Sequence, residues 1–134
     1  MSGRTCITRF RVRARSISAV RRHVTATLTD WKLGLLIEDA VLIASELTTN
    51  VVHHAKGMGD YFELSLRRRD GVLALEVADS YRWRMPELHK PAPEDLSGRG
   101  LFLVDALSDS WGVRPRDPGK TVWAHLALHR TEQP

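Results

Sequence analysis

The chain has 134 residues, of which 43% are hydrophobic and 27% charged, and its formal net charge is +4. This size and balance fit one globular domain with its own core. A single cysteine, Cys6, excludes an internal disulfide framework, and Glu38 and Asp39 interrupt the longest apolar run before it could span a membrane. Because the N-terminus lacks the apolar core of a signal peptide, we expect a cytoplasmic protein.

The first predicted elements are a strand and two helices. Arginines alternate with apolar residues over 9–14, which predicts a strand with one wet face. Ser16 is a suitable N-cap for a helix to about Asp30, and Gly34 separates it from a second helix over 35–55. The apolar face of this second helix is predicted to carry Leu36, Ile37, Ala40, Val41, Ile43, Ala44, Leu47, Val51 and Ala55.

The second half of the chain is predicted to contain four strands and one helix. Strands are expected over 61–68 and 72–78, joined by the hairpin signal Asp70-Gly71. The proline-rich stretch 80–97 shows no period and is predicted to be a loop of the kind that forms a lid or a binding element. The last predicted elements are a helix over 100–108 and strands over 111–114 and 121–129.

This order of elements predicts an α+β fold. We expect a two-layer sandwich, in which a mixed, mainly antiparallel sheet has helices packed on one face. Residues 1–134 would form this single domain, with frayed ends at 1–8 and 130–134.

The helix over 35–55 carries a polar row that suits a metal ion. Glu46, Asn50 and His54 are spaced four apart and are therefore neighbours on the helix surface. A carboxylate and a carboxamide beside the apolar face suit magnesium, which takes few protein ligands and keeps phosphate oxygens and waters. The alternative is a solvated polar stripe without function.

Two further segments each have a structural and a functional interpretation. Asp79 ends a strand, where an acid usually forms a turn but can also accept a hydrogen bond from an exocyclic amino group, such as that of adenine. Gly98 and Gly100 precede a helix, whose free N–H groups bind phosphate, although such a pair is often only a turn and a cap.

The order and spacing of these motifs resemble those of the GHKL (Bergerat-fold) ATPase superfamily. The motifs are E-L-x-x-N-x-x-x-H-A at 46–55, a strand ending at Asp79, G-R-G-L-x-L-V at 98–104 and G-K-T-V-W at 119–123. The closer resemblance, over residues 10–128, is to the small anti-sigma-factor serine/threonine kinase-like branch that is common in actinobacteria. It implies the Bergerat fold, a histidine-kinase-like ATPase domain, and ATP and Mg²⁺ as cofactors.

The resemblance also implies a role for each matching residue. Asn50 would be the metal ligand, and Glu46 would be the general base that accepts a proton from water or an incoming hydroxyl. Asp79 would accept a hydrogen bond from the adenine amino group, with help from Thr121. The implied cofactor-binding residues are Asn50, His54, Asp79, Gly98, Arg99, Gly100, Leu101 and Thr121.

One departure from the family pattern leaves two functions open. The superfamily's second motif is usually D-x-G-x-G, whereas residues 79–83 are D-S-Y-R-W, with Tyr81 at the first glycine position. Retention of Glu46 and Asn50 favours a kinase that phosphorylates a STAS-type anti-anti-sigma partner and binds a sigma factor when that partner is absent. Loss of the glycines favours a non-catalytic regulator that acts by partner exchange. The resemblance also suggests a homodimer.

The arginines are spread over several predicted elements and have no interleaved stacking aromatics. This pattern is typical of a solvated surface or of a docking patch for an acidic protein. Neither nucleic acid nor a membrane is expected as a partner.

Overall fold

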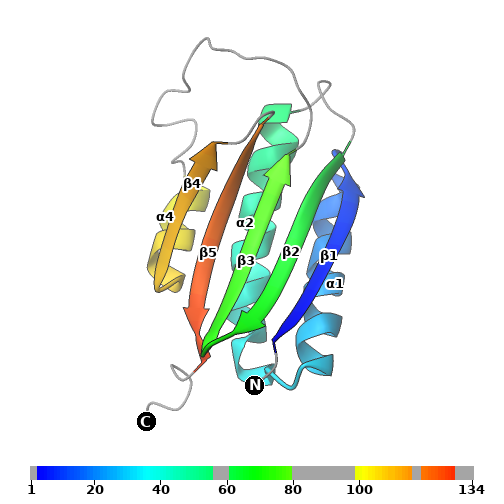
Figure 1. The fold of residues 1–134 in the computed structure, drawn as a ribbon. Helices are drawn as coiled ribbons and strands as arrows, with labels where there is room; N and C mark the ends of the chain where they lie inside the picture. Colours follow the sequence, from blue (N-terminus) through cyan, green and yellow to red (C-terminus); the bar gives the residue numbers. More distant parts are fainter. Residues whose placement is uncertain (1–2, 56–60, 80–98, 116–118, 129–134) are drawn as a thin grey trace.

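The described part of the chain folds into one five-stranded antiparallel sheet, in the order β1-β2-β3-β5-β4 (Figure 1). The computed structural model describes residues 3–55, 61–79, 99–115 and 119–128. Its strands are β1 Arg4–Arg11, β2 Tyr61–Arg69, β3 Val72–Asp79, β4 Ser110–Pro115 and β5 Lys120–Ala127. Its helices are α1 Arg15–Asp30, the 3-10 turn η1 Gly34–Leu36, α2 Ile37–Ala55 and α4 Arg99–Leu107.

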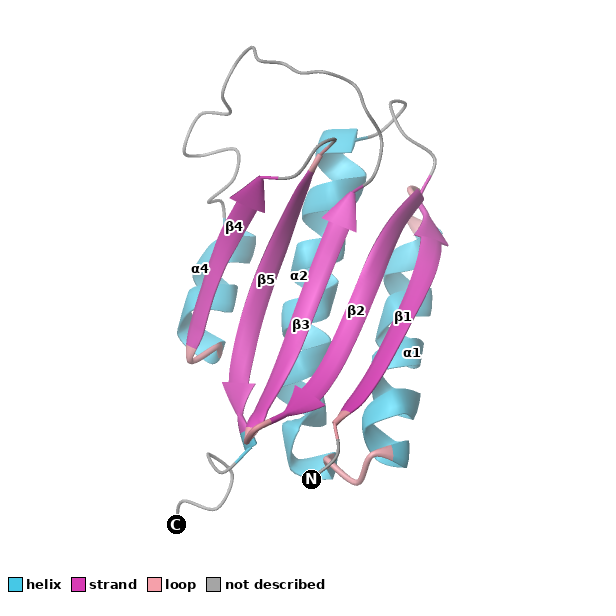
Figure 2. Ribbon diagram, in the orientation of Figure 1, coloured by secondary structure: helices cyan, strands magenta, loops and turns pink. Residues whose placement is uncertain are grey.

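The helices form a second layer on one face of the sheet, and Figure 2 shows α1, α2 and α4 all behind the strands. The predicted α+β sandwich is therefore confirmed, and every strand pairing within the described residues is antiparallel. In that part of the chain, no helix combines the length and the apolar character needed to cross a membrane.

The core lies between the two layers. Alternate residues of β2 and β3 are fully buried, among them Leu64, Leu66, Leu73 and Leu75. Burying one such side chain contributes about 1.5–3 kcal/mol. The helices pack apolar residues at helical spacing against these strands. The buried ones are Val20, Val24, Leu28, Leu36, Ala40, Ile43, Ala44, Leu47, Val51, Leu101 and Val104.

The apolar face predicted for α2 is confirmed for its central residues. Ala40, Ile43, Ala44, Leu47 and Val51 are buried, and so is Leu36, which belongs to η1 because α2 begins at Ile37 rather than at residue 35. Ile37 and Val41 are partly buried against the same core, and the side chain of Ala55 is outside the described set.

Strand β1 begins and ends earlier than predicted. It starts at Arg4 rather than residue 9, and residues 4–8 pair with β2 through the register Arg4↔Arg68 to Thr8↔Leu64. Residues 4–8 are therefore not frayed, because the neighbouring strand supplies their hydrogen-bond partners. Beyond Arg11 the chain turns, with the Arg13 N–H donating to the Arg11 carbonyl oxygen at 3.0 Å.

Ser16 is not the N-cap that the sequence predicts. Ala14 occupies that position without a side-chain cap, and Ser16 lies inside α1. The Ser16 hydroxyl donates instead to the Arg11 carbonyl oxygen at 2.7 Å. Ser16 is buried against the end of β1, so its hydroxyl satisfies a strand carbonyl and fixes the start of the helix to the sheet.

The hairpin between β2 and β3 is confirmed. Asp70 and Gly71 have φ of 52° and 78°, and Arg69 pairs with Val72 across them. Two positive φ values in a two-residue loop are typical of a type I′ turn, whose twist matches that of the strands. The predicted loop over 80–97 and Gly98 lie outside the described residues.

Candidate functional site

Four segments that carry predicted site residues meet at one end of the sandwich. β3 ends at Asp79, β5 begins at Lys120, α2 ends at Ala55 and α4 begins at Arg99. Figure 1 shows all four of these ends together at the top of the molecule. Glu46 and Gly119 are 73 positions apart in the sequence, and the fold brings their motifs onto neighbouring elements.

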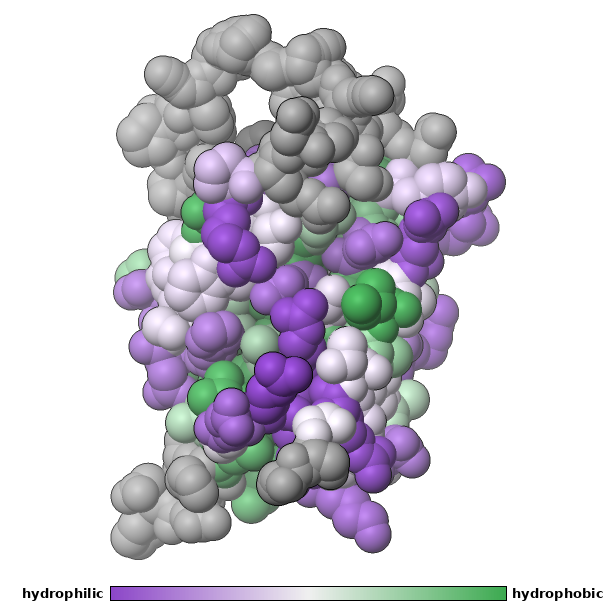
Figure 3. Space-filling model, in the orientation of Figure 1, coloured by the Kyte–Doolittle hydropathy of each residue, from purple (hydrophilic) through white to green (hydrophobic). Residues whose placement is uncertain are grey.

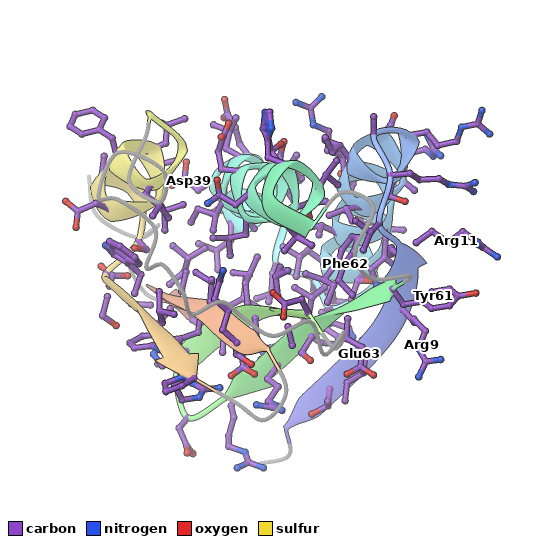
Figure 4. All side chains as sticks on the ribbon, turned by 90° about the horizontal axis from the view of Figure 1, so that it is seen from above. Arg9, Arg11, Asp39, Tyr61, Phe62 and Glu63 are labelled. Atoms are coloured by element: carbon purple, nitrogen blue, oxygen red, sulfur yellow. The ribbon has the colours of Figure 1, made fainter. Side chains whose placement is uncertain are left out.

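Asp79 is the most deeply buried acidic side chain described, with 3% of its surface exposed. The backbone N–H of Lys120 donates to its Oδ1 at 3.2 Å. A buried carboxylate is costly unless it is hydrogen-bonded, so this contact to β5 both stabilises the group and fixes its position. Asp79 pairs with Phe62 in β2, and Figure 4 shows Phe62 directed toward the helices. The Asp79 side chain therefore belongs to the helix-covered side of the sheet.

Thr121 lies on the neighbouring strand but faces the other way. It pairs with Ala78, which in turn pairs with Glu63, and Figure 4 shows Glu63 directed away from the helices. Because side chains alternate along a strand, Thr121 and Asp79 belong to opposite faces of the sheet. Thr121 is buried, at 6% exposure, but the structure does not bring it to the Asp79 side.

The residue that sequence reasoning missed at this point is Gly119. Its φ is +85°, and a Cβ at this position would overlap the Asp79 carboxylate and lie 2.5 Å from the Asp79 carbonyl oxygen. Lys120, predicted only as part of the G-K-T-V-W motif, supplies the N–H that holds Asp79. The signal in the sequence was the Gly-Lys pair directly before a strand, but its partner on β3 could not be identified without the strand pairing.

Glu46 and Asn50 lie on the flank of α2 that faces α4. Figure 4 shows Asp39 between these two helices, and Glu46 and Asn50 follow it by seven and eleven residues on the same side of the helix. Both side chains are partly buried. Glu46 and Asn50 therefore offer a carboxylate and a carboxamide oxygen on the side of α2 that faces α4.

The second glycine motif is only partly described. Arg99 and Gly100 form the start of α4, where backbone N–H groups lack intrahelical partners and favour an anion. Leu101 is buried at 6% exposure in the core, so its side chain anchors the helix. His54 lies in the last turn of α2, and its side chain is outside the described set.

The donor set suits a weakly held, oxygen-ligated cation. Within the described residues, no group of three or more His, Cys, Asp or Glu side chains could hold a metal ion alone. Magnesium does not need one, because it is commonly bound through one or two protein oxygens plus phosphate and water. The Asn50 carboxamide oxygen is suited to be one of these protein ligands.

A separate hollow lies at the opposite end of the sandwich. Its volume is about 310 Å³ and its lining residues are Lys32, Leu33, Gly34, Leu35, Leu36 and Leu128. These belong to the α1–α2 connection and the region after β5, far from the end that carries Asp79. The hollow therefore takes no part in the candidate site.

Residues 10–126 match the histidine kinase-like ATPase domain family, and the chain belongs to this family. The resemblance to the GHKL superfamily is thereby confirmed. Among solved structures, the chain is similar to the RsbU and RsbW domains of Rv1364c from Mycobacterium tuberculosis, with a TM-score of 0.68 and 17% identity. The match covers 92% of this chain and 32% of that one, and at this identity it shows a shared fold. No curated protein matches the sequence significantly.

Proposed function

We propose that this chain binds ATP with Mg²⁺ at the end of the sandwich where Asp79 lies. The observation that carries the proposal is the buried Asp79 carboxylate, held by the Lys120 N–H at the end of β3 in a chain of the histidine kinase-like ATPase family. A fixed carboxylate accepts a hydrogen bond from the amino group of adenine. Guanine presents a carbonyl oxygen at the corresponding position, which a carboxylate repels.

The remaining residues of the site would bind the metal ion, contact the phosphates and accept a proton. Asn50 would hold the magnesium ion, and the backbone at Arg99 and Gly100 would contact the phosphates. When bound, the nucleotide supplies a phosphoryl group whose charge the metal helps to neutralise. Glu46 would accept the proton from the attacking hydroxyl, and His54, Gly98 and Leu101 complete the set implied by the family motifs. The motifs also imply Thr121, which lies on the opposite face of the sheet from Asp79.

We further propose that the acceptor is a serine or threonine hydroxyl of a STAS-type anti-anti-sigma protein, so that the chain acts as an anti-sigma factor kinase and binds a sigma factor when the STAS protein is absent. The motif resemblance supports this assignment, and the fold shared with a protein that contains an RsbW domain is consistent with it. The same resemblance supports a homodimer.

A second candidate function is favoured by one feature of the sequence. Residues 79–83 lack the glycines usual after the aspartate, and Tyr81 occupies the first of their positions. A chain in which this segment restricts the nucleotide would regulate by binding partners alone, without phosphoryl transfer.

Calorimetric titration with ATP, with and without Mg²⁺, tests the proposal on the wild type and on Asp79→Asn and Glu46→Gln. We expect magnesium-dependent binding that Asp79→Asn weakens by about tenfold or more, because the amide presents a donor toward the adenine amino group. Glu46→Gln should keep the binding and lower phosphoryl transfer to a STAS-type substrate by about a hundredfold or more. Absence of binding at millimolar ATP would reject the nucleotide site. Normal binding without transfer in the wild type would favour the non-catalytic regulator.

A further inference from the structure

The sheet has one face that no described element covers. The helices pack on the side of Phe62, whereas Arg9 and Glu63 project from the opposite side, with Tyr61 beside Arg9 (Figure 4). We call this opposite side the open sheet face. By strand alternation and pairing, its members are Thr5, Ile7, Arg9, Arg11, Tyr61, Glu63, Ser65, Arg67, Arg69, Val72, Ala74, Glu76, Ala78, Ser110, Gly112, Arg114, Thr121, Trp123, His125 and Ala127.

Positive charge exceeds negative charge on the open sheet face. Figure 3 shows hydrophilic side chains running across it, interrupted by small hydrophobic areas. Its charged residues are Arg9, Arg11, Arg67, Arg69 and Arg114 against Glu63 and Glu76.

Pairing within the face leaves this excess in place. The Glu76 carboxylate is shared by two guanidinium groups, Arg67 at 3.4 Å and Arg114 at 3.3 Å. The glutamate side chain is 14% exposed, whereas the two arginine side chains are 42% and 53% exposed. One partly buried carboxylate therefore orients two outward-facing cations, which keep capacity for further acceptors.

Aromatic rings hold other parts of the face in fixed positions. The guanidinium groups of Arg9 and Arg11 lie 5.4 and 5.2 Å from the centroid of the Tyr61 ring, within cation–π distance. The Trp123 and His125 rings lie 4.7 Å apart. A Cβ on Gly112 would lie 2.8 Å from Trp123, so the glycine gives the indole room to lie over β4.

These side chains have the residue composition of a binding surface, and their neighbours hold them in defined conformations. Arginine, tyrosine and tryptophan are the residues most enriched where binding energy is concentrated. Side chains that are already held by neighbours lose less conformational entropy when a partner binds. The face therefore combines anchoring rings with oriented cations.

We propose that the open sheet face docks the acidic surface of a partner protein. Charge complementarity selects this partner: a second copy of the same face would bring arginines against arginines. The carboxylates of Glu63 and Glu76, on β2 and β3, would repel a continuous phosphate backbone. They are compatible with a protein surface whose acidic residues lie opposite the arginines. This surface lies outside the candidate nucleotide site, and the inference does not depend on the proposed function.

The test uses poly-L-glutamate as the probe and two matched double variants of the full chain. Arg9→Gln with Arg114→Gln changes the open sheet face, and Arg15→Gln with Arg22→Gln changes exposed arginines of α1 on the helical side. Each pair removes the same charge, so the general attraction of a basic protein for an acidic polymer falls equally. We expect the face pair to weaken binding about tenfold and the helix pair to change it by about twofold or less, by calorimetry at physiological salt.

A third variant is expected to bind the probe more tightly, a result that misfolding would not produce. Glu63→Gln removes a carboxylate that lies 4.0 Å from Arg9, so binding of the probe should tighten by about twofold to threefold. Amide chemical-shift changes in the wild type should map to β1, β2, β3, β4 and β5. Equal losses in the two double variants, or shifts confined to α1, would overturn the proposal.

The same variants also test two other possible partners of the open sheet face, a second copy of the chain and a nucleic acid. Sedimentation that shows a wild-type dimer, lost only in Arg9→Gln with Arg114→Gln, would assign the face to a second copy and overturn the acidic-partner proposal. A DNA oligonucleotide of matched charge that binds tighter than poly-L-glutamate, with loss only in the face pair, would assign it to nucleic acid instead.

Discussion

Gly119 is the residue that makes room for the Asp79 carboxylate: a Cβ on it would overlap Oδ1 and lie 2.5 Å from the Asp79 carbonyl oxygen. The next residue, Lys120, donates its backbone N–H to the same Oδ1 at 3.2 Å. The turn before β5 therefore determines where the acid at the end of β3 is held.

Gly119→Ala is expected to weaken ATP binding by about tenfold or more, because the added methyl group displaces Asp79 and its φ of +85° strains any other residue. Calorimetric titration with ATP measures the effect. Gly34→Ala is the matched control, since nothing lies within 4 Å of a Cβ at Gly34, and it should bind ATP like the wild type. Unchanged binding by Gly119→Ala would contradict a role for Asp79 in nucleotide binding.

Thr48→Val is expected to stabilise the fold by about 1 kcal/mol. Thr48 is fully buried, and no group of the described residues accepts or donates a hydrogen bond at its Oγ1. Valine has the same shape without the unsatisfied hydroxyl. Thr49→Val is the control, because the Thr49 hydroxyl donates to the Ser45 carbonyl oxygen at 2.7 Å, and no gain is expected there. Urea unfolding of both variants decides, and an equal gain in both would point to helix propensity rather than to the buried hydroxyl.

The stability of the fold is expected to fall as the pH drops below about 6.5, in part through His23. Burial lowers the pKa of this imidazole from its ordinary value of 6.5, because the charged form is poorly solvated between α1 and β1. Its Nε2 lies 3.2 Å from Thr8 Oγ1, and its ring meets Phe10 edge-on at 5.8 Å. As the pH falls through 6.5, the unfolded chain binds a proton before the folded chain does, so the free energy of unfolding decreases until the pH passes the folded pKa.

Urea unfolding across this pH range measures the His23 contribution as the difference between the wild type and His23→Gln. The glutamine variant should lose less stability between neutral and mildly acidic pH. Parallel pH profiles for the two proteins would show that His23 does not contribute.

Local patterns were sufficient for much of the fold. The helical period of residues 35–55 predicts the buried face of α2, and Asp70-Gly71 predicts the hairpin, because both signals act over a few residues. The start of β1 was missed because its first residues, from Arg4 onward, are ordered by pairing with β2, which lies some sixty positions further along the chain. Ser16 was misassigned for a similar reason, since its hydroxyl serves a strand carbonyl.

The candidate site shows the same division. Motif order was enough to nominate Asp79, Asn50 and Glu46 as site residues and to indicate the family to which the chain belongs. Motif spacing could not show that Thr121 and Asp79 belong to opposite faces, because that depends on the register between β3 and β5. The stacking of Arg9 and Arg11 on Tyr61 was also missed, since these residues are adjacent only across a strand pair.

The alternation of β2 between Leu64 and Leu66 on one side and Glu63 and Arg67 on the other has a mechanical consequence. A slip of one residue would exchange two buried leucines for charged side chains, at a cost of several kcal/mol for each charge placed in the core. The strands therefore cannot slide past one another while the domain stays folded. A partner bound at the open sheet face could therefore affect the Asp79 end only by tilting the sheet as a rigid body or by moving the helices and loops attached to it.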